Sequence, residues 1–257
     1  MSELQGLHAV VTGGGSGIGA AVARELLLRG ARVTLMGRDL ARLQAQRARL
    51  TELGPVAEQR CDVGDETSVQ AAFAAAAADF GAVDILVNNA GQAQTAPFVK
   101  TSLAQWQQML QVNLTGTFLC TQQVVAGMAQ RGFGRIINVA STASLKGYAY
   151  VAAYCAAKHG VLGLTRALAL EMAKKGVTVN AVCPGYTETE IVEQAVANIV
   201  AKTGRTAEAA RQELAAGNPQ GRLVQPEEVA HTVAWLASRG ASAMTGQAIA
   251  VCGGEWS

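Results

Sequence analysis

Two side chains that share one face of a predicted helix offer the clearest chemistry in this 257-residue sequence. Tyr154 and Lys158 are four residues apart in the stretch YCAAK, so a helix places the phenol beside the ammonium group. A free tyrosine has a pKa of about 10 and is a poor base at neutral pH. A neighbouring cation lowers that pKa, which favours general acid–base chemistry. The alternative is a chance pair on an exposed helix.

A serine upstream favours the chemical interpretation of this pair. Ser141 follows the apolar run 135–139, which has the composition of a buried strand. The carboxyl ends of parallel strands in α/β sheets meet at the crevice where ligands bind. We therefore expect Ser141 to open onto the same pocket as Tyr154 and Lys158.

A glycine-rich segment near the N-terminus, VVTGGGSGIGAAVARELL, joins an apolar run to a helical pattern. Gly13, Gly17 and Gly19 stand in the arrangement TGxxxGxG, which suits a tight turn whose backbone N–H groups approach a pyrophosphate at a helix start. The spacing is neither GxGxxG nor a phosphate-binding loop with Gly-Lys-Ser/Thr. A flexible strand-to-helix linker is the alternative.

The end of the second predicted strand, 32–36, bears on which nicotinamide cofactor is bound. An acidic residue about 20 residues beyond the glycines typically bonds the ribose hydroxyls of NAD. Here Gly37 and Arg38 follow the strand, which favours the 2′-phosphate of NADP(H) over NAD(H). Alternatively, Arg38 is a surface residue, while Asp39 caps the next helix or itself reaches the ribose.

The elements that must position these residues alternate along the chain between apolar β-rich runs and helical patterns. This alternation predicts parallel βαβ units in one doubly wound α/β domain over 1–257, with about seven strands and helices on both faces. A polar, helical stretch at 186–221 interrupts the alternation after a strand end, and we interpret it as a substrate lid. The predicted strands are 8–11, 32–36, 56–60, 85–88, 135–139, 178–182 and 248–251, and the predicted helices are 18–29, 40–53, 67–80, 103–131, 152–175 and 226–238.

Composition excludes several other classes of protein. Half of the residues are apolar and the formal net charge is only +2, without a basic block, so we expect no nucleic-acid partner. The uncharged run 101–130 is too polar to span a membrane, and no signal peptide is evident. The five cysteines lack the spacing of a metal site, so we assign no metal and expect a cytoplasmic protein.

The motifs, taken in order, resemble the short-chain dehydrogenase/reductase family over essentially the whole chain. They are TGGGSGIG at 12–19, NNAG at 88–91, Asn113 within VNL, Ser141, Tyr154, Lys158 and the pair Pro184-Gly185. Each motif alone is weak, whereas the ordered set is specific. The resemblance implies a Rossmann-type fold and reversible hydride transfer between a nicotinamide and a carbonyl or secondary alcohol.

The resemblance also implies roles for four residues. Tyr154 matches the acid/base that exchanges a proton with the substrate oxygen, and Lys158 matches the lysine that bonds the nicotinamide ribose and lowers the pKa of the tyrosine. Ser141 matches the serine that holds the substrate oxygen. Asn113 matches the asparagine that anchors a water in a proton relay, with a plain polar helix residue as the alternative.

Cofactor contacts are implied along the chain in the same way. Asp62 and Val63 match residues that contact adenine, and residues 89–91 match the segment that lines the adenosine side. Pro184, Gly185 and Thr189 match the loop that holds the nicotinamide carboxamide. Some NADP(H) members carry a basic residue within the glycine turn, so Ser16 leaves Arg38 to hold the phosphate alone. The full predicted set is Gly13, Ser16, Gly17, Ile18, Gly19, Arg38, Asp62, Val63, Asn89, Ala90, Gly91, Tyr154, Lys158, Pro184, Gly185 and Thr189.

The segments GQAIAVCGGEWS and AYCAAKHGVLGLTRALALE look most like the 3-oxoacyl-thioester and polyketide ketoreductase branch. We therefore expect a ketoreductase acting on a CoA or carrier-protein thioester or on a hydrophobic ketone, although the lid lacks a dense basic cluster. The family usually forms homotetramers, and the uncharged helices suit subunit packing. Residues expected to line the substrate site, unless they are simply core, are Ser144, Leu145, Tyr148, Val151 and Tyr186.

Three other functions remain open at this point. The first is an NAD-dependent dehydrogenase of a hydroxyacyl-CoA or of a cyclic or aromatic secondary alcohol. The second is a non-catalytic nucleotide-binding regulator, which would normally have lost one of the four residues Asn113, Ser141, Tyr154 and Lys158. The third is an S-adenosylmethionine methyltransferase, which shares a glycine-rich first turn but has no need of Ser141, Tyr154 and Lys158.

Overall fold

A computed structural model describes residues 3–256, and its centre is a seven-stranded sheet in which all neighbouring strands are parallel. The strand order is β3-β2-β1-β4-β5-β6-β7, so the doubly wound α/β fold predicted from the sequence is confirmed. The strands are β1 (His8–Thr12), β2 (Arg32–Gly37), β3 (Val56–Arg60), β4 (Ile85–Asn88), β5 (Gly134–Val139), β6 (Val177–Pro184) and β7 (Ala248–Val251).

The helices follow the predicted stretches, with one difference in the longest of them. The predicted helix 103–131 consists of α4 and α5, which are joined by a π-helical turn over Gln111–Thr115. Such turns often mark functional sites, and this one contains Asn113. The helices around the sheet are α1 (Gly17–Leu28), α2 (Leu40–Leu50), α3 (Glu66–Phe80), α4 (Leu103–Leu110), α5 (Gly116–Arg131), α6 (Ala152–Met172) and α9 (Pro226–Ala237).

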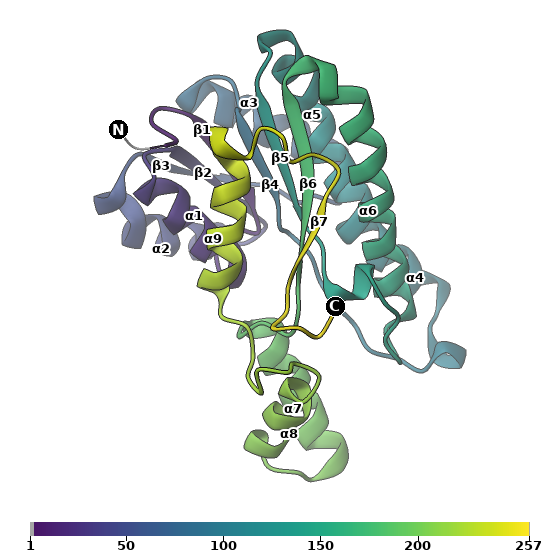
Figure 1. Ribbon diagram of the computed structural model, residues 1–257. Helices are drawn as coiled ribbons and strands as arrows, with labels where there is room; N and C mark the ends of the chain where they lie inside the picture. The colour runs from purple at the N-terminus through teal and green to yellow at the C-terminus, as the bar shows by residue number, and fades with distance from the viewer. Residues whose placement is uncertain (1–2, 257) are drawn as a thin grey trace.

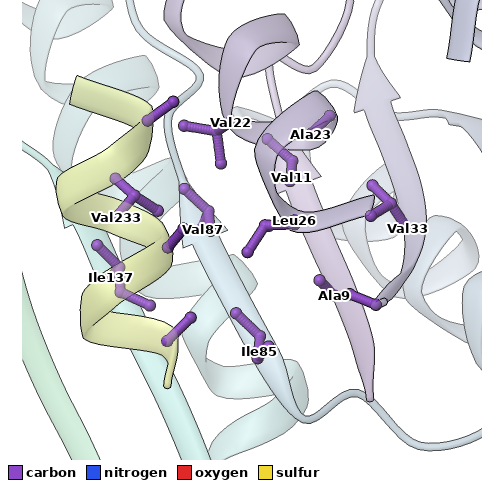
Figure 2. Close-up of a cluster of buried hydrophobic side chains, with 14 of the residues drawn as sticks. Ala9, Val11, Val22, Ala23, Leu26, Val33, Ile85, Val87, Ile137 and Val233 are labelled. Carbon is purple, nitrogen blue, oxygen red and sulfur yellow. The ribbon is translucent and has the colours of Figure 1, made fainter. Parts of the chain in front are cut away.

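Helices cover both faces of the sheet, which is why its strands are nearly continuous apolar runs. On one face, α1 and α9 pack against each other and against the strands, as Figure 2 shows for Val22, Leu26 and Val233 over Val87 and Ile137. On the other face, α3, α5 and α6 cover the alternate strand residues. The layered arrangement is visible in Figure 1.

The segment 186–221 contains two helices, α7 (Glu190–Thr203) and α8 (Ala207–Ala215), which project beyond one end of the sheet (Figure 1). They share a small apolar core of their own, formed by Val192, Val196 and Ala210 among others. A parallel bridge between Thr187 and Val224 joins the two ends of the segment. The segment therefore lies at the same edge as the end of β6, from which it departs.

Two further properties concern the whole described chain. Within residues 3–256, no helix is both long and apolar enough to cross a bilayer. All five cysteines are buried and unpaired, and the same residues hold no group of three or more His, Cys, Asp or Glu side chains suited to a metal ion.

Candidate active site

The glycine turn after β1 is shaped by steric requirements at three positions. Gly13 and Gly17 have φ of +65° and +51°, a region that favours glycine. A Cβ at Gly19 would overlap the backbone carbonyl oxygen of Gly13. The turn therefore brings bare backbone to the N-terminus of α1, whose first N–H groups have no partners within the helix.

The two remaining glycines of the turn are explained by β2 and α2. Gly14 donates its N–H to the Met36 carbonyl at 3.1 Å, and a Cβ there would lie 3.0 Å from the carbonyl oxygen of Val11. A Cβ at Gly15 would lie 3.1 Å from Cγ of Arg42. The sequence alone does not account for these two positions, because the contacts come from the neighbouring strand and helix.

A cavity of about 560 Å³, here called the adenosine-side cavity, lies in front of this turn at the carboxyl ends of β1, β2 and β3. Its walls combine bare backbone from the turn with polar and cationic side chains from the other two strand ends. The residues predicted from the sequence that line it are Gly13, Ser16, Arg38, Asp62, Val63, Ala90 and Gly91.

One residue of this cavity was missed by sequence reasoning. Arg42, in the first turn of α2, lines the cavity, and its Nη1 lies 3.4 Å from the Ser16 hydroxyl and 2.5 Å from a carboxylate oxygen of Glu190 on α7. Arg42 is therefore a second cation at this cavity, and that Arg38 alone holds a phosphate stays a prediction. The feature of the sequence that could have pointed to Arg42 is the helix cap. Asp39 caps α2 by accepting the Arg42 N–H at 3.0 Å, so Arg42 lies in the first turn of the helix, next to the end of β2.

The segment after β4 links the turn to the centre of the sheet. The Thr12 hydroxyl accepts the backbone N–H groups of Asn89 and Ala90, both at 3.0 Å, and the Asn89 amide donates to the Thr12 carbonyl at 2.9 Å. These bonds hold the ends of β1 and β4 together. The position of Asn89 and Ala90 thus agrees with the steadying of the sheet that the resemblance implies.

A second cavity, of about 770 Å³ and here called the substrate cavity, lies at the ends of β4, β5 and β6 beneath α7. It brings together Ser141, Tyr154 and Lys158, which come from the end of β5 and from α6. Other predicted residues that line it are Ile18, Asn89, Gly91, Asn113, Tyr148, Val151, Pro184, Gly185, Tyr186 and Thr189.

Burial is the largest influence on the pKa of Tyr154. It raises that pKa to about 12, and the Ser141 hydroxyl acts in the opposite direction. Nζ of Lys158 lies 5.8 Å from the centre of the Tyr154 ring and donates to the Val139 carbonyl at 2.8 Å. Burial also lowers the pKa of Lys158 itself to about 8. That Lys158 lowers the pKa of Tyr154 stays a prediction.

The loop that carries Ser141 is held by its own side chains. Ser141 caps a short 3₁₀ turn (Thr142–Ser144) by accepting the Ala143 N–H at 3.1 Å, and Ser144 accepts the Ser141 N–H at 3.2 Å. Ser144 is therefore buried as a capping residue, and Leu145 packs against the apolar residues beneath the loop. Neither lines the substrate cavity, so these two predictions are wrong.

Asn113 lies in the π-helical turn with both its amide nitrogen and its amide oxygen hydrogen-bonded. The amide nitrogen donates to the carbonyls of Gln92 and Met109 at 2.9 and 3.0 Å, and the amide oxygen accepts the Gln92 N–H at 3.2 Å. A Cβ at Gly91 would lie 2.8 Å from that amide oxygen and 3.7 Å from Lys158 Nζ. Asn113 therefore fixes the chain after β4 close to the lysine, while the relay role stays a prediction.

Comparison with known proteins agrees with this geometry. A family model described as Enoyl-(Acyl carrier protein) reductase matches residues 13–255. The chain is 43% identical over 249 residues to a putative ketoacyl reductase of Streptomyces coelicolor. The match covers 96% of this chain and 95% of that protein. The chain has the same identity and the same coverage with the cis-4-hydroxycyclohexanecarboxylate dehydrogenase of Sinomonas cyclohexanicum.

A solved structure gives the same result in three dimensions. A variant of actinorhodin polyketide ketoreductase with NADPH superimposes with a TM-score of 0.94 and is 40% identical, covering 99% of this chain and 98% of that chain. Sequence and fold thus agree over nearly the full length of the protein. The chain belongs to the short-chain dehydrogenase/reductase family and is a nicotinamide-dependent oxidoreductase.

Proposed function

We propose that the protein is an NADP(H)-dependent ketoreductase acting on a hydrophobic ketone or a 3-oxoacyl thioester. The observation that carries the proposal is the convergence of Ser141, Tyr154 and Lys158 in one cavity that also receives Tyr148, Val151 and Ile191. Ser141 supplies a hydrogen-bonding hydroxyl, Tyr154 a proton donor and Lys158 an amine. The other three residues supply a mostly apolar surface. Relatives named as ketoacyl reductases support the same substrate class.

The adenosine-side cavity fits a dinucleotide. Side chains at Gly13, Gly17 and Gly19 would fill the turn that a pyrophosphate must approach, and the cavity beyond it has room for an adenosine. We assign the pyrophosphate to the turn, the adenine to Asp62 and Val63, and the nicotinamide to the substrate cavity beside Ile18, Pro184, Gly185 and Thr189. When bound, the nicotinamide supplies or accepts the hydride.

Two guanidinium groups support a preference for the 2′-phosphate of NADP(H). Arg38 and Arg42 both line the adenosine-side cavity, on either side of Asp39, whose carboxylate is engaged by the backbone of α2. Arg42 is also paired with Glu190 on α7, so a phosphate would have to share or displace that carboxylate, and Arg38 carries more of the argument. Guanidinium groups bind phosphate through charge-assisted hydrogen bonds. A relative of the same fold solved with NADPH supports the preference.

Tyr154 is the proton donor in the proposed reaction. A pKa raised to about 12 by burial keeps the phenol protonated across the neutral range, so it donates its proton to the carbonyl oxygen as negative charge develops there. This protonation state favours reduction of the ketone. Oxidation of an alcohol needs the phenolate, which this burial disfavours.

Ser141 and Lys158 orient the reacting groups. Ser141 lies beside Tyr154 at the end of β5, where its hydroxyl holds the substrate oxygen against the phenol. Lys158 is fixed by the Val139 carbonyl and faces Gly91, where it bonds the ribose of the nicotinamide. Asn113 holds the chain beside it and anchors the water of a proton relay.

The segment 186–221 is the substrate lid of a single catalytic domain in this proposal. Its helix α7 contributes Ile191, Val192 and Ala195 to the wall of the cavity. The cations Arg205, Arg211 and Arg222 are all paired with glutamates of the lid or of α9, whereas Lys202 on α7 lines the substrate cavity. These cations form no dense cluster for the phosphates of CoA or of a carrier protein. A hydrophobic ketone therefore fits this lid better than a thioester that is recognised through its phosphates.

A second candidate is a dehydrogenase of cyclic secondary alcohols. The relative that acts on cis-4-hydroxycyclohexanecarboxylate supports it, as does the apolar lining of the substrate cavity. The two candidates differ in the direction of hydride transfer and in the preferred cofactor, so one assay separates them.

The test is an assay of the purified protein with NADPH or NADH and a panel of linear, cyclic and aromatic ketones, and with NAD⁺ and the corresponding alcohols. The change in cofactor absorbance measures the rate in each direction. We expect reduction with NADPH in preference to NADH. Oxidation of cyclic alcohols with NAD⁺, without ketone reduction, favours the second candidate. No turnover in either direction, together with tight NADPH binding, favours a non-catalytic regulator.

We also propose that the protein assembles as a homotetramer. Leu103 on α4, Phe118 on α5 and Leu170 on α6 are apolar side chains that are 70%, 45% and 83% exposed. Burial of these side chains between copies removes apolar area from water. Light scattering that gives the mass of a stable monomer contradicts this assembly. The cytoplasmic location stays a prediction.

A further inference from the structure

The segment after β7, residues 252–256, carries a buried carboxylate to the substrate cavity. Gly253 and Gly254 have φ of +61° and +94°, and they turn the chain back toward the end of β6. The side chain of Glu255 is consequently only 5% exposed. No role implied by the family resemblance includes this residue.

The carboxylate of Glu255 is bonded to a residue of the cavity wall. Its Oε1 accepts the phenol proton of Tyr148 and lies 3.1 Å from Nζ of Lys146. The Tyr148 oxygen also lies 2.7 Å from the hydroxyl of Thr142. Because a carboxylate only accepts, the phenol donates to Glu255 and the Thr142 hydroxyl donates to the phenol. The Tyr148 hydroxyl therefore donates one hydrogen bond, to Glu255, and accepts one, from Thr142.

The aromatic ring of Tyr148 is held as firmly as its hydroxyl. Nζ of Lys146 lies 5.0 Å from the ring centre, which is a cation–π distance. The ring of Tyr186, from the loop after β6, meets it edge to face, with 6.3 Å between centres and 82° between planes. Tyr148 and Tyr186 both line the substrate cavity.

The same carboxylate also touches the opposite wall of the cavity. A Cβ at Gly185 would lie 3.0 Å from Oε2 of Glu255, so the carboxylate packs against the backbone of the loop that follows β6. Glu255 thus lies between the loop that carries Tyr148 and the loop that carries Gly185 and Tyr186. Burying a carboxylate costs free energy that its partners must offset, so stability alone is a weak reason for it to be here.

We propose that Glu255 is a positioning residue that holds the Tyr148 ring against Tyr186 and so sets the width of the substrate cavity, which selects ketones by the bulk next to the carbonyl. The inference rests on the proposed ketoreductase function. Glu255 acts through Tyr148 and touches neither the carbonyl nor the proton donor. With the ring fixed, a rigid cyclic ketone gains contacts that a flexible linear one does not.

The experiment compares 2-tetralone, a bicyclic ketone, with ethyl acetoacetate, a linear 3-oxoester, as substrates with NADPH. We expect Glu255→Ala to lower the ratio of kcat/KM for the bicyclic over the linear ketone by about tenfold, chiefly through a raised KM, since one pocket contact is worth about that much discrimination. Glu255→Gln still accepts the phenol proton, so it should retain the ratio to within about threefold.

A double-mutant cycle shows whether the effect passes through Tyr148. Tyr148→Phe should lower the ratio as Glu255→Ala does, and adding Glu255→Ala to Tyr148→Phe should lower it little further. Glu58→Ala is the matched control. Like Glu255, Glu58 is mostly buried and paired with a cation, here Arg47, but it lies on β3 away from the substrate cavity. Its ratio and its NADPH Kd should equal those of the unmodified protein.

Several results overturn the inference. They are an unchanged ratio in folded Glu255→Ala, a full further loss when Glu255→Ala is added to Tyr148→Phe, or a weakened NADPH Kd in Glu255→Ala. If Glu255→Ala does not fold, an unchanged ratio in Tyr148→Phe overturns it instead. If the unmodified protein reduces neither ketone, the proposed function fails rather than the role of Glu255.

Discussion

The adenosine-side cavity and the substrate cavity lie at the same edge of one sheet, yet they are built from different materials. The first is lined largely by the backbone of the glycine turn and by strand-end loops held by local bonds, such as Asp39 to the Arg42 N–H and Asp62 to the Gly64 N–H, although Arg42 also reaches Glu190, 148 residues away. The second depends more on side chains, and one of its pairs, Tyr148 and Glu255, joins residues 107 positions apart.

The difference teaches where each cavity tolerates change. A site built from backbone depends on the absence of side chains at a few glycines. The residues around these glycines can vary, but the turn has no space for a Cβ at Gly19. A site built from side chains depends on pairs, and each pair can be altered without moving the sheet. We therefore expect selectivity between ketones to reside in the substrate cavity, and the predictions below test that division.

The largest expected effect separates chemistry from cofactor binding. Tyr154→Phe removes the proton donor and should lower kcat by about a thousandfold, since general acid catalysis contributes on this scale. The NADPH Kd should stay within a factor of about two, because the substitution removes only the phenol hydroxyl and leaves the ring in the cavity wall. Stopped-flow turnover and fluorescence titration measure the two quantities. A Tyr154→Phe enzyme with normal kcat contradicts the mechanism.

The next effect tests the backbone-built cavity. Gly19→Ala places a Cβ on the Gly13 carbonyl oxygen and close to the Asn89 amide, so the turn must shift. We expect NADPH binding to weaken by about a hundredfold, on the scale of a few lost hydrogen bonds to a charged group. Gly163→Ala on α6 is the control, because open space surrounds that position and alanine favours a helix. Equal NADPH affinity in both variants contradicts the steric argument.

A buried lysine gives a stability prediction with a defined pH window. The pKa of Lys158 is lowered from its ordinary 10.5 to about 8 in the fold, so between these values the unfolded chain binds the additional proton. Stability therefore rises with pH across this window. We expect Lys158→Met to be inactive but more stable than the unmodified protein at pH 7, by on the order of 3 kcal/mol, a gain that shrinks toward pH 10.5.

Denaturant unfolding of both proteins at several pH values measures this difference. Lys174→Met, which replaces an exposed lysine at the end of α6, should show no such pH-dependent gain. A Lys158→Met protein that is less stable at pH 7 shows that the hydrogen bond to the Val139 carbonyl outweighs the cost of burial.

The smallest expected effect concerns the cofactor phosphate. Arg42→Ala should weaken NADPH binding by about fivefold and leave NADH binding nearly unchanged, because an exposed guanidinium contributes modestly. Arg38→Ala should act in the same direction, and the KM for the ketone should move in neither variant. Isothermal titration with both cofactors measures the ratio. An equal loss for NADH and NADPH shows that the two arginines do not read the phosphate.

The same division explains what the sequence predicts. Strand and helix periodicity predict the seven parallel strands, and the glycine turn and Ser141 follow from their places at strand ends. Asp62 is identified only through the family resemblance. Arg42 and Glu255 do not follow from the sequence, since their roles depend on α7 meeting α2 and on the last segment folding back to Tyr148. The raised pKa of Tyr154 also depends on burial, which spacing along a helix does not report.

The packing of α9 on α1 has a consequence for how the protein is made. The turn that approaches the cofactor is anchored by α1, yet α1 is covered by α9, which is synthesised more than half a chain later. Until α9 leaves the ribosome, Val22 and Leu26 have no cover on that face. We therefore expect the nucleotide-binding half to complete its packing only after α9 is made, so that a nascent chain ending before Pro226 exposes apolar surface of α1.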